Sequence, residues 1–170
     1  RGLQIDTLYA NPILDSLTIT NHPGMAIYWR CDGSISAKNI TASGNALGDE
    51  LQIPGCAVTA GREWDLADTG IPVHVTNYIT VEDGGVLSIA PGATLGFDAL
   101  QQFYVKPGGS LYALGTADEP IILTRYSDAQ TPWKGVWNSG GTMILLNTEI
   151  DYAGTASTQA VLIEGANSAT

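Results

Sequence analysis

A repeat of about 24 residues is the feature that most constrains the fold of this chain. Residues 81–89, Val-Glu-Asp-Gly-Gly-Val-Leu-Ser-Ile, align with residues 105–113, Val-Lys-Pro-Gly-Gly-Ser-Leu-Tyr-Ala, so that the first Val, both glycines and the Leu coincide. Residues 26–28 precede the similar segment 50–52 by the same interval. This period is too short for a propeller blade of about 40–45 residues, and the frame of a leucine-rich repeat is absent.

Short strand patterns bounded by Gly, Pro, Asn or Asp recur along the chain, whereas no segment keeps a helical apolar period. The sequence therefore predicts an all-β fold. A repeat of this length, with two or three short strands in each copy, predicts one turn, or rung, of a parallel β-helix. Alternation points Leu87 and Ile89 into the core and Ser88 toward water. The 170 residues correspond to roughly seven rungs.

Three linked motifs resemble a known family. They are Gly-Val-Leu-Ser-Ile-Ala-Pro-Gly at 85–92, Gly-Gly-Ser-Leu-Tyr-Ala-Leu-Gly-Thr at 108–116 and Trp-Lys-Gly-Val at 133–136. In this order they resemble the right-handed parallel β-helix repeat modules of large bacterial and archaeal secreted or cell-surface proteins. The resemblance implies a right-handed solenoid and an extracellular or cell-surface location. It implies no single activity, because this fold hosts adhesins, polysaccharide lyases and hydrolases alike.

The resemblance also suggests an internal organisation for the single β-helix segment 1–170. Residues 1–60 resemble closing rungs, 61–77 a junction, and 78–170 opening and middle rungs. Solenoid ends need polar caps, and the sequence shows none. We therefore expect a piece of a longer or tandem-repeated chain, with an arbitrarily bounded fragment as an equally weighted alternative.

Charge excludes two classes of partner. The chain has 17 acidic and 7 basic residues and a formal charge of −10. So few cations argue against nucleic acid and against anionic membrane surfaces as partners. Apolar stretches such as 143–146 are far shorter than the roughly 18 residues of a membrane span, so no membrane insertion is expected.

Candidate catalytic groups are sparse. Glu149 and Asp151 share one face of a predicted strand and form the best carboxylate pair for glycoside hydrolysis, although a solvated strand edge is the favoured interpretation. His22 and His74 belong to no set of zinc ligands, so no metal site is predicted. The acidic, glycine-rich turn at 82–85 has oxygen ligands suited to calcium, but a plain turn is favoured and no cofactor is expected.

Two further pairs have structural and functional interpretations. Cys31 and Cys56 lie about one rung apart, a spacing that fits either a disulfide or two stacked free thiols. Trp133 and Trp137 share parity, so we expect both on one face, packed in the core or, as the weaker interpretation, stacked on a glycan.

The expected function is non-enzymatic and structural or adhesive. The chain would form part of a surface adhesin, stalk or self-assembling filament, with neighbouring modules, another copy stacked end to end, or surface glycans as partners. The alternative is a carbohydrate-active or glycan-binding β-helix that acts through Glu149, Asp151, Trp133 or Trp137.

Overall fold

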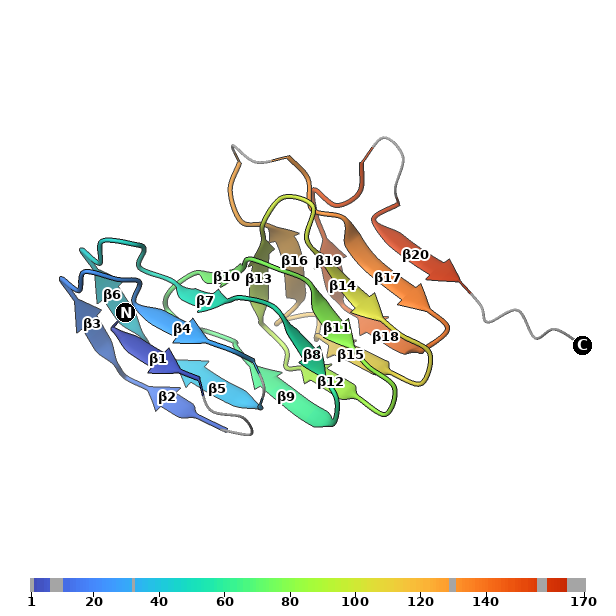
Figure 1. Ribbon diagram of the computed structural model, residues 1–170, viewed down its shortest axis with the longest axis horizontal. Helices are drawn as coiled ribbons and strands as arrows, with labels where there is room; N and C mark the ends of the chain where they lie inside the picture. Colours follow the sequence, from blue (N-terminus) through green and yellow to red (C-terminus); the bar gives the residue numbers. More distant parts are fainter. Residues whose placement is uncertain (1, 7–10, 32, 129–130, 156–158, 165–170) are drawn as a thin grey trace, which may run out of the picture.

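The computed structural model describes residues 2–6, 11–31, 33–128, 131–155 and 159–164 and shows a parallel β-solenoid of about six turns (Figure 1). All strands of these described residues that pair in sheets pair in parallel, and none of the described residues is helical. The predicted all-β parallel solenoid is therefore confirmed.

The strands form four sheets, named A to D. Sheet A stacks β1 (Leu3–Ile5), β4 (Ile27–Trp29), β7 (Leu51–Ile53), β10 (Val73–Val75), β13 (Thr94–Phe97), β16 (Ile121–Arg125) and β19 (Thr148–Ile150). Sheet B stacks β2 (Ile13–Asp15), β5 (Ile35–Lys38), β9 (Gly61–Asp65), β12 (Val86–Ile89), β15 (Ser110–Leu114) and β18 (Thr142–Leu146). Sheet C pairs β3 (Thr18–Thr20) with β6 (Thr41–Ser43). Sheet D stacks β8 (Cys56–Val58), β11 (Ile79–Val81), β14 (Gln102–Val105), β17 (Gly135–Ser139) and β20 (Val161–Glu164).

The repeat read from the sequence sets the register of the central rungs. Val81 pairs with Val105 and Leu87 with Leu111, which is the 24-residue alignment of the two glycine-containing segments. Ile27 likewise pairs with Leu51. The turn count falls below the predicted seven because later rungs are longer. Ser110 pairs with Thr142, 32 residues away, and the extra residues form the loops around β16.

The core is a stack of inward-facing side chains from successive rungs. In β12 the side chains alternate as predicted, with Leu87 and Ile89 buried and Ser88 partly exposed. One column of aligned apolar residues runs the length of sheet A: Leu3, Ile27, Leu51, Val73, Leu95, Leu123 and Ile150. Each side chain packs on those above and below, so burial of one rung depends on the presence of its neighbours.

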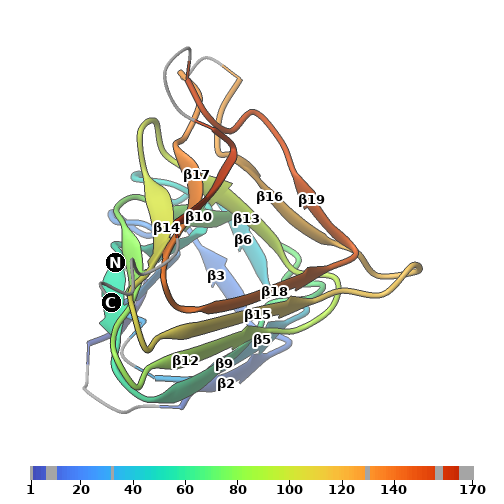
Figure 2. The same ribbon diagram turned by 90° about the vertical axis from the view of Figure 1, so that its right-hand side faces the viewer.

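The cross-section of the solenoid changes after the second rung. The first two rungs pass through sheets A, B and C, whereas from β7 onward each rung passes through A, D and then B. In the view along the solenoid axis, sheets A, B and D form three sides of a triangle (Figure 2). The change occurs at β8. The predicted junction at 61–77 contains β9 and β10, which continue sheets B and A, and the division into 1–60 and 78–170 stays a prediction.

A disulfide lies where the cross-section changes. Cys31 follows β4 in the second rung, and Cys56 begins β8, one of the two edge strands of sheet D. Their Cα atoms are 5.9 Å apart, and the sulfurs are bonded. On this side of the molecule the second rung has no strand of sheet D with which β8 can pair. The covalent bond therefore joins the two rungs where backbone pairing in sheet D stops.

Replacing both cysteines, Cys31→Ser with Cys56→Ser, is expected to lower the free energy of unfolding by about 3 kcal/mol, because the bond closes a loop of about 25 residues in the unfolded chain. Urea unfolding of the double variant, of the oxidised protein and of the reduced protein tests this. The reduced protein should match the double variant, and equal stability of all three would contradict the prediction.

Candidate functional site

The carboxylate pair predicted near the C-terminus, Glu149 and Asp151, lies at the surface. Glu149 is an exposed residue of β19, and Asp151, directly after that strand, is half-buried. Within the described residues neither carboxylate makes a hydrogen bond or an ion pair. The main chain of Glu149 belongs to the pairing of β19 with β16, and that of Asp151 is also engaged, since its N–H donates to Leu123 O and its carbonyl accepts from Trp133 Nε1. Among the described residues, this pair therefore has no partner that would tune it for acid–base chemistry.

The two predicted tryptophans lie on opposite faces, which corrects the expectation that one face carries both. Trp133 is 0% exposed and stacks on Phe97, with ring centroids 4.3 Å apart. A sugar has no access to it, so Trp133 as a glycan-binding residue is wrong and its core-packing interpretation holds. Trp137 is half-buried on the outer face of sheet D and stacks on Tyr104 at 4.6 Å. The alternation breaks because Gly135 has a φ of 94° and is followed by the buried Val136.

A hydrogen-bonded cluster that the sequence reasoning did not assemble lies on the outer face of sheet A. His74 of β10 is its centre: Nδ1 lies 2.9 Å from Glu50 Oε1, and Nε2 lies 2.8 Å from Asp98 Oδ1. The hydroxyl of Tyr126 donates to the other oxygen of Glu50, Oε2, at 2.5 Å. Glu50 precedes β7, Asp98 follows β13 and Tyr126 follows β16, so the cluster connects four successive rungs.

Local register explains how the two carboxylates reach opposite sides of one imidazole. His74 is level with Gln52 in one neighbouring strand and with Gly96 in the other. Glu50 therefore lies two residues before the level of His74, and Asp98 lies two residues after it. One carboxylate approaches each ring nitrogen. Equal spacing of 24 residues between Glu50, His74 and Asp98 was visible in the sequence and could have flagged the group.

The electrostatics of the cluster favour a charged imidazole. Ionised carboxylates only accept hydrogen bonds, so both nitrogens of His74 must donate. Burial alone lowers the pKa of His74, but the hydrogen bonds to Glu50 and Asp98 outweigh burial and leave that pKa raised. The hydrogen bond to His74 holds the pKa of Glu50 below its ordinary value. Burial, with a contribution from Glu50, raises the pKa of Tyr126.

A glycine allows the aromatic ring of this cluster to take its place. Tyr126 stacks on His74 with ring centroids 3.6 Å apart and planes within 6°. Gly96 lies between their strands. A Cβ at Gly96 would lie 3.0 Å from Tyr126 Cα and 3.1 Å from Cδ2, which is too close for ordinary packing. The absence of a side chain at Gly96 is therefore a condition for the His74–Tyr126 stack.

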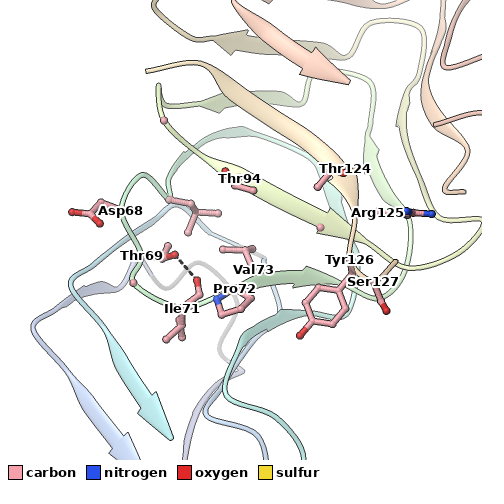
Figure 3. Close-up of a pocket in the computed structure, with 14 residues that line it drawn as sticks. Asp68, Thr69, Ile71, Pro72, Val73, Thr94, Thr124, Arg125, Tyr126 and Ser127 are labelled. Atoms are coloured by element: carbon pink, nitrogen blue, oxygen red, sulfur yellow. Dashed lines mark hydrogen bonds between the residues drawn. The ribbon is translucent and has the colours of Figure 1, made fainter. Parts of the chain in front are cut away.

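A cleft of about 610 Å³ opens beside Tyr126 on the same outer face (Figure 3). The segment 66–72, which connects β9 to β10, forms one wall. Thr94 and Gly96 of β13 and Thr124 of β16 line its interior, and Tyr126 stands at the opposite side. The cleft and the cluster thus share Tyr126.

The cluster has the residue types of an acid–base site, and His74 and Glu50 use their hydrogen-bonding atoms within the cluster. Both nitrogens of His74 and both oxygens of Glu50 are engaged within the cluster. A general base needs a lone pair within reach of the substrate proton, and a raised pKa disfavours the Tyr126 phenolate at neutral pH. The arrangement is suited to bracing four rungs and fixing the wall of the cleft.

Comparison of the chain with protein-family models, with curated proteins and with solved structures found no match. The fold-level part of the family resemblance stands on the structure, and its bacterial or archaeal surface context stays a prediction.

Among the described residues, no group of three or more His, Cys, Asp and Glu side chains is placed to hold a metal ion. In the turn considered for calcium, Glu82 instead binds Lys106 Nζ at 2.7 Å. The part of the chain that the structure describes contains no helix long and apolar enough to cross a membrane.

Gly96→Ala is expected to lower the free energy of unfolding by about 1–3 kcal/mol, because the added methyl group must displace Tyr126 or shift a strand. NMR would show the ring-current shifts between His74 and Tyr126 decrease. Gly61→Ala is the matched control, since a Cβ there meets nothing within 4 Å. A fully stable Gly96→Ala protein with an unchanged stack would contradict the packing argument.

The cluster should make stability depend on pH in a defined direction. The folded-state pKa of His74 is raised, so its contribution is complete below about pH 6.5 and is lost as pH rises through the folded value. The pKa of Glu50 is lowered, so its contribution is present above about pH 4.3 and is lost as pH falls through its folded value. The stability difference between the wild type and His74→Gln should therefore be largest near pH 5–6 and should shrink toward pH 9.

Urea unfolding at several pH values, together with NMR titration of the His74 ring, measures this dependence. His22→Gln removes the other histidine and serves as the control. A His74 midpoint at or below about 6.5 would show that the carboxylates do not hold the proton on the ring.

Proposed function

We propose that this chain is a rigid, non-catalytic β-helix module of an extracellular or cell-surface protein. The observation that carries the proposal is that both ring nitrogens of His74 and both carboxylate oxygens of Glu50 already have hydrogen-bond partners within the cluster. Groups that could have formed an active site are instead paired with one another across four rungs. A catalytic site would leave at least one of them directed at a substrate.

Other contacts between rungs support the same role. Lys106 binds Glu82, and Lys38 binds Asp65 at 2.9 Å, each pair joining successive strands on the outside of the solenoid. With parallel backbone pairing throughout the sheets, such contacts resist separation of the rungs. Stiffness along the axis is the property that a stalk or an adhesin requires.

The extracellular location rests on the cysteines. The only two cysteines of the chain are joined in a disulfide, and disulfides persist in oxidising compartments. Few charges and outward-facing Ser and Thr, such as Ser88 and Thr80, are consistent with a surface module.

For partners, we favour neighbouring modules over a second identical copy. The rungs built from β1–β6 use sheets A, B and C, whereas the rungs that contain β7–β18 use A, D and B. Identical copies stacked with the first kind of rung on the second would not match edge to edge on every side. A neighbouring module whose contacting rung follows the same path as the rung that it meets would continue the backbone pairing of all three sheets of that rung.

Incubation of the folded protein with neutral and uronate-containing polysaccharides tests the non-catalytic role. We expect no release of reducing ends or unsaturated products by the wild type. Glu50→Gln should lower the free energy of unfolding by about 2 kcal/mol, because it weakens charge-assisted hydrogen bonds of a buried group. Glu119→Gln, an exposed change elsewhere, should leave stability unchanged.

Turnover by the wild type that is lost in Glu50→Gln, or in Glu149→Gln with Asp151→Asn, would overturn the proposal if those variants keep the wild-type circular dichroism. It would favour a carbohydrate-active enzyme instead.

A further inference from the structure

The cleft beside Tyr126 has unused hydrogen-bonding capacity. Thr94 is exposed and Thr124 half-buried, both on the outer face of sheet A, and neither hydroxyl has a hydrogen-bonding partner among the described residues. Thr69, in the opposite wall, already donates to Ile71 O at 2.6 Å, which holds the 66–72 segment in shape (Figure 3). Two hydroxyls that can each donate and accept therefore line a preformed hollow.

The aromatic wall of the cleft is held rigidly. Tyr126 is stacked on His74 and bonded to Glu50, so little side-chain freedom remains to be lost when a ligand packs against it. An aromatic ring beside fixed hydroxyls offers both apolar contact and hydrogen bonds to one molecule. The volume of about 610 Å³ is within the usual range for small-molecule sites.

Charge narrows the class of ligand. Asp68 lies at the rim of the cleft with its carboxylate directed away from it (Figure 3), and the chain carries a formal charge of −10, which disfavours an anion. Arg125 is one of the residues that line the cleft, but its side chain points away from it in Figure 3. Its guanidinium lies over the ring of Tyr152 at 3.9 Å and binds Asp128 at 2.9 Å. The ligand should therefore be uncharged and rich in hydroxyl groups.

We propose that the cleft between the 66–72 segment and Tyr126 binds a neutral saccharide. Thr94 and Thr124 would hydrogen-bond its hydroxyls, and the ring of Tyr126 would pack against its apolar C–H surface. The inference rests on the proposed function, since a rigid surface module with such a cleft would attach to glycans without cleaving them.

NMR titration of the whole chain with the methyl glycosides of glucose, galactose, mannose and N-acetylglucosamine tests the proposal. At least one glycoside should give saturable shifts of the Thr94 and Thr124 methyl groups and of the Tyr126 ring. Glucuronate should bind more weakly than the methyl glucoside. Thr124→Val, which removes only a hydroxyl, should weaken binding by about 2- to 10-fold.

Thr94→Trp should abolish binding by filling the cleft, and it should fold because Thr94 is exposed. Thr80→Val is the matched control on the outer face of sheet D and should leave affinity unchanged. No saturable shift with any neutral glycoside, binding that survives Thr94→Trp, or preference for glucuronate would each overturn the saccharide site. Those results would not contradict the proposed non-catalytic function. Cleavage of a bound glycoside, by contrast, would contradict the non-catalytic function but would support the saccharide site.

Discussion

Parallel pairing of the backbone between successive rungs is the interaction on which the rest of this structure depends. Each strand satisfies its N–H and C=O groups only through the rungs on either side, so no rung is stable alone. Pairing also aligns the inward side chains, which turns a set of three- to five-residue strands into a continuous column from Leu3 to Ile150. The loops vary in length because they lie outside this constraint, as the 32-residue interval between Ser110 and Thr142 shows.

The same pairing explains the polar cluster. Stacked strands bring outward side chains of neighbouring rungs close together, which is unfavourable for like charges and favourable for a cation between two anions. His74, flanked by Glu50 and Asp98, is the favourable case. Gly96 completes it by leaving the space over which Tyr126 reaches His74. A small shift in register between rungs would separate the four side chains of the cluster. The cluster therefore forms only in the observed register and stabilises that register.

A disulfide joins two rungs at the place where backbone pairing in sheet D ends. The strand β8 is an edge strand of sheet D, and exposed edges are prone to unwanted association. The bond between Cys31 and Cys56 ties this edge to the preceding rung, in which the chain follows a different path. The disulfide therefore lies at the change in cross-section, where β8 has no strand of sheet D in the preceding rung with which to pair.

Sequence alone was sufficient for the solenoid, because period and alternation are properties of neighbours along the chain. The alignment of Val81 with Val105, the inward positions of Leu87 and Ile89, and the one-rung spacing of Cys31 and Cys56 all follow from counting residues. Counting failed where the backbone departs from a regular strand. The positive φ of Gly135 separates Trp133 from Trp137, whereas the rung count stayed close to the predicted seven, at about six turns. Only the tertiary structure assembled Glu50, His74, Asp98 and Tyr126 and the cleft beside them. The 24-residue spacing of Glu50, His74 and Asp98 is visible in the sequence, but their contacts depend on strand register to within two residues and on the space above Gly96, which that spacing alone does not specify.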